Sequence, residues 1–159
     1  MKVLYTGSFD PITVGHLDII KRISKMFDTV VVTVFNNKEK KYWFSIEERC
    51  QMVKDAVKDL KNVEVDFTEG LVVDYCKNNN ISIIIRGLRA VSDYEYELAV
   101  LSINKHLNQE LETIFLVASP QYSFLSSSIV KDVAEHGGNF EDLVPENVAY
   151  CIKRLLGRK

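Results

Sequence analysis

The chain has 159 residues and 47% of them are hydrophobic, so we expect residues 1–159 to form a single domain with a continuous core. Lys and Arg total 20 against 22 for Asp and Glu, and the net charge of -2 argues against nucleic acid or a membrane surface as a partner. The three cysteines are widely spaced without a CxxC pair, which disfavours a disulfide framework and a zinc site. No apolar run is long enough to span a membrane, and we expect a cytoplasmic protein.

Five short apolar runs, most of them rich in β-branched residues, predict strands. In chain order they lie at 2–6, 29–35, 63–67, 82–85 and 113–118.

Helical patterns alternate with these strands. An apolar stripe with helical spacing covers 15–27. Ser45 followed by Glu48, and Ser92 followed by Glu95, match the capping box and predict two further helix starts. The last two helices are expected at 126–135 and from Pro145 onward.

This βαβα alternation, with strands that are apolar almost throughout, predicts a doubly wound, Rossmann-like α/β fold. We expect a five-stranded parallel sheet with helices on both faces, joined by right-handed crossovers. Ligands of such sheets bind beyond the carboxyl ends of the strands. The residues that directly follow each strand are therefore the candidates for a functional site.

The loop after the first strand is rich in small residues and leads into a helix. Gly7 and Gly15 allow close backbone approach, and the helix amino terminus favours an anion, so 6–16 predicts a phosphate cradle. His16 either donates to a phosphate or caps local backbone. Asp10, the only acid in this loop, is expected to bond local backbone in the turn.

Cationic and hydroxyl groups follow three of the other strands. The basic segment 36–41 follows the second strand and, taken alone, is typical of a solvated loop. Arg86 and Arg89 follow the fourth strand, where two guanidiniums repel unless an anion bridges them. The serines at 126–128 either cap the following helix or hold a second phosphate position.

Several motifs resemble a known family. Thr13-Val-Gly-His16 resembles the TxGH form of the HxGH signature of nucleotidyltransferases, and the segment 125–131 is similar to their ISSxxxR-like second signature. The phrases GSFDPITVGHLDII, FSIEER, IIRGLRAVSDYEYE and YSFLSSSIVKDVA together resemble bacterial phosphopantetheine adenylyltransferases over nearly the whole chain. Thr13 and Lys131 depart from the general superfamily pattern in the way that this subfamily does.

The resemblance implies transfer of AMP from ATP to 4'-phosphopantetheine, which gives dephospho-coenzyme A and pyrophosphate in coenzyme A biosynthesis. Mg²⁺ would be carried with ATP, with no dedicated metal ligands from the protein. The resemblance also implies a homohexamer and suggests feedback by coenzyme A. An acceptor phosphate is already an anion, so the reaction requires positioning and charge neutralisation rather than a protein nucleophile.

The resemblance also assigns roles to residues. The catalytic residues would be His16, Lys40 and Arg86. His16 would stabilise the transition state at the α-phosphate, and Lys40 and Arg86 would bind the acceptor phosphate, with Lys41 as an alternative to Lys40. Acceptor-binding residues would be Ser8, Lys40, Leu71, Val72 and Arg86. ATP-binding residues would be Ser8, Phe9, His16, Gly87, Leu88, Arg89, Glu97, Tyr122, Ser123, Phe124, Leu125, Ser126, Ser127 and Ser128.

Two other functions are compatible with a phosphate cradle. A sister nucleotidyltransferase would use ATP or CTP with an acceptor such as nicotinamide mononucleotide or glycerol 3-phosphate, and would differ in its acceptor pocket. A nucleotide-binding regulatory module would bind ATP without releasing pyrophosphate, because folds of this kind host many functions.

Overall fold

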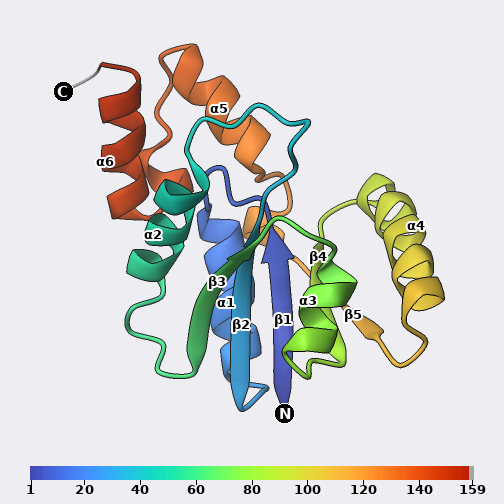
Figure 1. Cartoon of the computed structure of the whole chain (residues 1–159). Helices are drawn as coiled ribbons and strands as arrows, with labels where there is room; N and C mark the ends of the chain where they lie inside the picture. The colour runs from blue at the N-terminus through green and yellow to red at the C-terminus, as the bar shows by residue number, and fades with distance from the viewer. Residues whose placement is uncertain (158–159) are drawn as a thin grey trace.

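The computed structural model describes residues 1–157, apart from the side chain of Ser92, and is built on a five-stranded parallel sheet (Figure 1). Residues 158–159, the end of the predicted domain, lie outside the described part. The strands are β1 Lys2–Gly7, β2 Thr29–Phe35, β3 Val63–Thr68, β4 Ile83–Leu88 and β5 Glu112–Val117. Their order, β3-β2-β1-β4-β5, reverses direction between β1 and β4, and this creates the switch point at which ligands bind in such sheets.

The five predicted strands are all present, and the one large difference is at β4. This strand continues past the predicted end at Ile85 as far as Leu88, because Arg86 and Gly87 pair in register with β5. The prediction that Arg86 lies in a loop is therefore wrong. A neighbouring strand supplies backbone partners even where the side chains lack a strand pattern.

Six α-helices connect and cover the strands. They are α1 Val14–Ser24, α2 Ile46–Ala56, α3 Val72–Asn78, α4 Val91–Leu107, α5 Ser127–Glu135 and α6 Glu146–Leu155, with short 3-10 turns at Pro120–Tyr122 and Glu141–Leu143. The sequence pattern did not predict α3, whose 7 residues are too few to show a helical period. The helix predicted at 15–27 ends earlier, at Ser24.

The two predicted capping boxes have different outcomes. Ser45 caps α2, and its side chain and that of Glu48 exchange hydrogen bonds with each other's backbone as predicted. The box at Ser92 is wrong, because α4 begins at Val91 with Ala90 as its N-cap. The Asp93 carboxylate, in the first turn, reaches back to accept the backbone N–H of Arg89, so the carboxylate part of a capping box is provided two residues earlier than predicted.

Helices cover both faces of the sheet, as predicted. On one face, Ile20, Val53, Val130 and Val148 bring α1, α2, α5 and α6 into one apolar core. On the other face, α3 packs a smaller cluster against β1, β2 and β4, and α4 contacts β4 beside it (Figure 1). The cysteines are free, and none of the described helices has the length and apolar character of a membrane span.

Candidate active site

Two cavities open at the carboxyl edge of the sheet, each of about 360 Å³. We name the first the serine-side cavity, because Ser126, Ser127 and Ser128 line it, and the second the leucine-side cavity, after Leu71 and Leu101. The two adjoin each other and share the lining residues Thr6, Gly7, Ser8, Lys40, Arg86, Tyr96 and Glu97. The arrangement is that of two compartments with a common wall at the switch point of the sheet.

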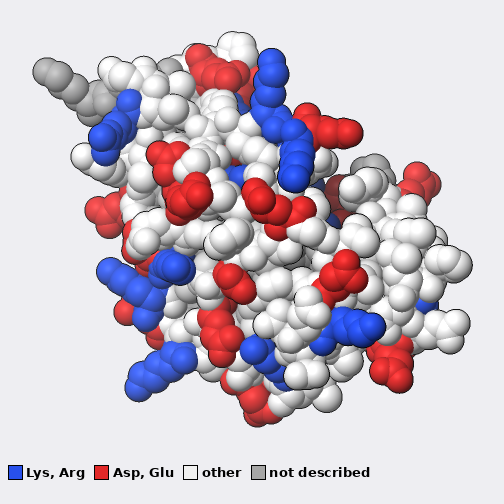
Figure 2. All heavy atoms as spheres, viewed as in Figure 1, with Lys and Arg blue, Asp and Glu red and all other residues white. Residues whose placement is uncertain are grey.

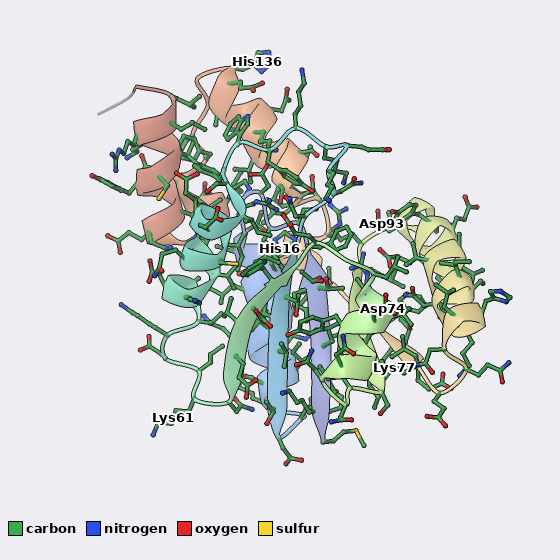
Figure 3. The ribbon with its side chains drawn as sticks, in the orientation of Figure 1. His16, Lys61, Asp74, Lys77, Asp93 and His136 are labelled. Atoms are coloured by element: carbon green, nitrogen blue, oxygen red, sulfur yellow. The ribbon has the colours of Figure 1, made fainter. Side chains whose placement is uncertain are left out.

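His16 lies in the first turn of α1 and lines the serine-side cavity, above the carboxyl ends of the strands (Figure 3). Its Nδ1 accepts the backbone N–H of Thr13 at 3.0 Å, so the ring does cap local backbone. This acceptor role assigns the ring proton to Nε2. Burial, together with the charges of Arg89 and Arg86, lowers the pKa of His16 to about 4. The side chain is therefore neutral at pH 7 and still able to donate from Nε2, so the capping role does not prevent donation to a phosphate.

The loop before α1 is held in an unusual conformation. Phe9 has a φ of 48°, in the left-handed region that costs an ordinary residue roughly 1–2 kcal/mol. Its buried ring packs edge-on against Tyr5 and His16, with centroids 5.7 and 5.1 Å away. A Cβ on Gly7 would lie 3.2 Å from this ring, so the close packing favours glycine at that position. Packing thus fixes the orientation of the His16 ring.

Arg86 stands in the wall that the two cavities share. Its Nε and Nη2 donate to the two carboxylate oxygens of Glu97 at 2.7 and 2.6 Å, and its Nη1 donates to the carbonyl oxygen of Thr6 at 2.7 Å. Glu97 was expected to contact ATP, and the structure places it against Arg86 as a buried counter-ion. A guanidinium has five N–H donors, so further donors on Nη1 and Nη2 remain for a ligand.

Arg89 lines only the serine-side cavity. It forms an ion pair with Asp93, 3.2 Å away, and its Nη1 donates to the carbonyl oxygen of Leu125 at 2.9 Å. The expectation that Arg86 and Arg89 repel until one anion bridges them is therefore wrong. Each has a carboxylate of its own from α4, and Figure 3 shows Asp93 at the same edge of the sheet as His16.

The serine segment has the capping role that was considered for it, and it also lies where the second role, holding a phosphate, would require it. Ser126 is the N-cap of α5 and accepts the N–H of Ile129 at 3.1 Å. The hydroxyl of Ser127 donates to the carbonyl oxygen of Pro11 at 2.7 Å, which ties α5 to the loop before α1. All three serines still line the cavity. Capping therefore positions this segment without removing it from the cavity.

Most of the predicted residues line one or both cavities. Phe9, Gly87, Tyr122 and Leu125 line the serine-side cavity, and Leu71 and Val72 line the leucine-side cavity. Lys40 lines both, whereas Lys41 lines neither. The predicted residues Leu88, Ser123 and Phe124 are not among the lining residues of either cavity in the described chain.

Asp10 has a different role from the one predicted. Its carboxylate accepts the backbone N–H groups of Trp43 and Phe44, at 2.9 and 3.0 Å, so the backbone that it bonds is distant and not local. It also accepts from Lys131 Nζ at 2.6 Å. Lys131, the cation at the end of the second signature motif, thus forms an ion pair within the protein. Asp10 is buried and fully occupied by protein donors.

Magnesium ligands from the protein are scarce at this site. Asp93 and Glu97 line the cavities but each holds an arginine, and Asp10 holds Lys131. Within residues 1–157, no group of three His, Cys, Asp or Glu side chains is arranged to hold a metal ion. The donor set does not fit a metal site built from protein carboxylates.

Sequence reasoning missed several lining residues. On α4 these are Tyr96, Val100, Leu101 and Asn104, and together with Glu97 they recur at helical spacing along one face. The spacing alone did not distinguish them, because exposed apolar residues such as Leu98 and Ile103 on α4 obscure a single apolar face. Tyr5 on β1 also lines the serine-side cavity, where burial raises its pKa and keeps the hydroxyl protonated.

Comparison with known proteins places the chain in a family and finds solved structures with a similar fold. A family model described as Cytidylyltransferase-like matches residues 4–133, which include all the described residues that line the two cavities. The fold is similar to that of a lipopolysaccharide core biosynthesis protein from Thermoplasma volcanium GSS1, with a TM-score of 0.54 and 24% sequence identity. This match covers 75% of the present chain and 96% of the other, and it indicates a shared fold.

Proposed function

We propose that this chain, which belongs to the Cytidylyltransferase-like family of nucleotidyltransferases, transfers the AMP group of ATP to 4'-phosphopantetheine. The products would be dephospho-coenzyme A and pyrophosphate. Membership of the family indicates nucleotidyl transfer in general. The observation that carries the finer proposal is the pair of adjoining cavities, of different chemical character, that share Ser8, Lys40 and Arg86.

The serine-side cavity suits a nucleoside triphosphate. It offers His16, the serine hydroxyls at the start of α5 and the guanidinium of Arg89. Two helices, α1 and α5, begin at this cavity, and the partial positive charge at helix amino termini favours phosphate groups. These features support triphosphate binding, and they do not by themselves distinguish ATP from CTP.

The leucine-side cavity suits an acceptor with an extended, weakly polar arm. Its walls include Leu71, Val72, Val100 and Leu101, with Asn104 as a polar group among them. A pantetheine arm carries amide and methyl groups that match this mixture. Glycerol 3-phosphate and nicotinamide mononucleotide present several hydroxyls, for which the apolar side chains of the cavity offer no partners and Asn37, Asn104 and Thr113 offer few. This contrast supports the pantetheine acceptor over the sister substrates.

The proposed reaction is a direct displacement at the α-phosphorus of ATP. An oxygen of the acceptor phosphate forms the new P–O bond, and the bond to the pyrophosphate leaving group breaks. Lys40 and Arg86 would hold the acceptor phosphate at the common wall. Nε2 of His16, neutral and protonated, would donate to a nonbridging α-phosphate oxygen as negative charge builds there.

Magnesium would enter on the phosphates of ATP and leave with pyrophosphate, because the carboxylates at the site already hold cations. When bound, it would neutralise charge on the transferring and leaving phosphates. The free protein should therefore bind magnesium weakly, and EDTA should abolish turnover.

We also propose that the chain assembles with copies of itself, as a hexamer by the family resemblance. Large apolar side chains are exposed on α4 and β5, among them Val91, Tyr96, Ile103 and Val117. Figure 2 shows that the surface over α4 is mostly uncharged. Light scattering after gel filtration measures the assembly, and a monomer would contradict it. Because ATP is the proposed donor, we propose that the protein functions in the cytoplasm. We also propose that coenzyme A inhibits the enzyme by competing with the acceptor.

The decisive experiment is pyrophosphate release with a panel of substrates. ATP and CTP would each be combined with 4'-phosphopantetheine, nicotinamide mononucleotide and glycerol 3-phosphate, with unphosphorylated pantetheine as the control. We expect release only with ATP and 4'-phosphopantetheine. Release with another pair would identify a sister enzyme. Binding of ATP without release for any pair would indicate a regulatory module.

A further inference from the structure

Arg49 is a buried arginine on α2 that the proposed reaction does not use. Its side chain is 1% exposed, which makes it the largest fully buried side chain of the described residues. The guanidinium donates only to neutral oxygens: the carbonyl oxygens of Phe44 (3.1 Å), Ser8 (2.9 Å) and Phe35 (3.1 Å), and the side-chain oxygen of Asn36 (2.6 Å).

This guanidinium differs in its surroundings from Arg86 and Arg89. Those two pair with carboxylates, whereas no carboxylate of the described residues forms an ion pair with Arg49. Burying a charge without a counter-ion is costly unless dipoles replace the lost water. Here the lost water is replaced by oxygens that accept from each nitrogen of the guanidinium. The face of the Tyr42 ring, 3.8 Å away, also contacts it. A planar fork is required to reach all of these acceptors at once.

The acceptors lie at both ends of one segment, which we name the lysine loop, residues 35–44. Phe35 and Asn36 begin it and Phe44 ends it, so the guanidinium ties its two ends together. The middle of the loop, which includes Lys40, is exposed. The remaining acceptor, Ser8, belongs to the loop before α1. Arg49 thus joins the two segments that contribute Ser8 and Lys40 to both cavities.

We infer that Arg49 is a positioning residue that fixes the lysine loop, and with it Lys40, against Ser8 at the common wall of the two cavities. The inference rests on the proposed function only where substrates are concerned. The mechanical part, that Arg49 anchors the loop, stands on geometry alone.

A spectroscopic measurement tests the anchor without any substrate. Trp43 is the only tryptophan of the chain and lies in the lysine loop beside Phe44. Arg49→Met and Arg49→Lys should each raise the acrylamide quenching constant of Trp43 by about twofold or more, because this end of the loop loses its bond to the guanidinium and keeps only its bonds to Asp10. Lysine keeps the charge but not the fork, so it should not restore the wild-type value.

The matched controls are Arg22→Met and Arg22→Lys. Arg22 also donates to a backbone carbonyl, that of Val117, and lies outside both cavities. These variants should leave Trp43 quenching unchanged. Asn36→Ala removes one acceptor of the anchor without removing a buried charge, and it should raise quenching to a smaller extent. This variant keeps the test valid even where Arg49 variants fail to fold.

Turnover provides the second readout. In Arg49→Lys we expect KM for 4'-phosphopantetheine to rise about 10- to 100-fold, since displacement of a positioning group by about 1 Å can cost that much, while the Kd for ATP changes less than about threefold. Wild-type quenching in Arg49→Lys, or equal losses for both substrates, would overturn the inference. A wild-type protein that is inactive toward every acceptor would refute the proposed function and leave the quenching result to decide the anchor.

Discussion

The two cavities have about the same volume and share a wall, but different kinds of groups line them. The serine-side cavity is formed by two capped helix starts and by loops that hydrogen bonds hold together, such as that of Ser127 to Pro11. The leucine-side cavity is formed mainly by side chains of α4 and of the strand ends, with Val72 at the start of α3 and Leu71 exposed at its rim. Backbone groups recognise phosphate, whereas apolar side chains recognise the shape of an arm. Under the proposed function, this difference assigns nucleotide binding to the serine-side cavity and the choice of acceptor to the leucine-side cavity.

The largest expected effect is at the serine-side cavity. His16→Ala removes the Nε2 donor and should lower kcat by about 10²- to 10³-fold, as expected for a group that acts mainly in the transition state. Acceptor KM should change little. Steady-state kinetics measures this, with His136→Ala, an exposed histidine on the far end of α5, as the control. A kcat near that of the wild type would remove His16 from the mechanism.

The next largest effect is expected at Arg86 in the common wall, and it distinguishes acceptor binding from ATP binding. Arg86→Ala should raise acceptor KM by about 10- to 100-fold, the range expected for loss of hydrogen bonds to a charged group. Its effect on ATP affinity should be much smaller. Arg89→Ala should show the reverse pattern, because Arg89 lines only the serine-side cavity.

Calorimetry of ATP binding to both variants tests this pairing. If Arg86→Ala weakens ATP binding as strongly as Arg89→Ala does, Arg86 binds the nucleotide. The assignment of Arg86 to the acceptor would then be wrong.

A smaller effect is expected from the apolar side of the leucine-side cavity. Leu71→Ala removes part of its rim and should raise acceptor KM by about three- to tenfold, since such a truncation removes on the order of 1 kcal/mol of apolar contact. ATP affinity should not change. Met26→Ala, at an equally exposed apolar residue beyond α1, is the control. An equal loss in ATP affinity would argue against a separate acceptor cavity.

The smallest effect concerns pH. Since the pKa of His16 is lowered to about 4 from its usual 6.5, this residue should contribute no change in kcat between pH 6 and 8. Between 6.5 and 4 the unfolded chain binds the proton and the folded chain does not. The free energy of unfolding should therefore fall as the pH falls through this window, and His16→Gln should lose less stability there than the wild type.

Urea unfolding at pH 7 and pH 4.5 measures this difference, with His136→Gln as the control. A His16→Gln variant that loses as much stability as the wild type on acidification would mean that His16 is protonated in the folded chain.

The sequence was informative wherever a side-chain type alone carries the signal. The β-branched runs located all five strands, Ser45 and Glu48 located the start of α2, and the small-residue loop located the serine-side cavity. It was less informative on α4, where Glu97 and Asn104 lie at helical spacing but residues of both cavities and of the exposed surface alternate along the same helix. A helix that faces several different environments shows no single hydrophobic periodicity.

By itself, the sequence determined the order of the five strands and of the helices other than α3, and it supplied the prediction of a phosphate cradle in the first loop and the resemblance in its motifs. These depend on local propensity and on neighbours in the chain. The tertiary structure alone decided that Arg86 is paired with Glu97, that Asp10 bonds residues of the lysine loop and that Arg49 joins this loop to Ser8. Such pairings depend on which strands are neighbours in the sheet, and the partner of a charged or polar group is set by distance in space rather than by separation along the chain.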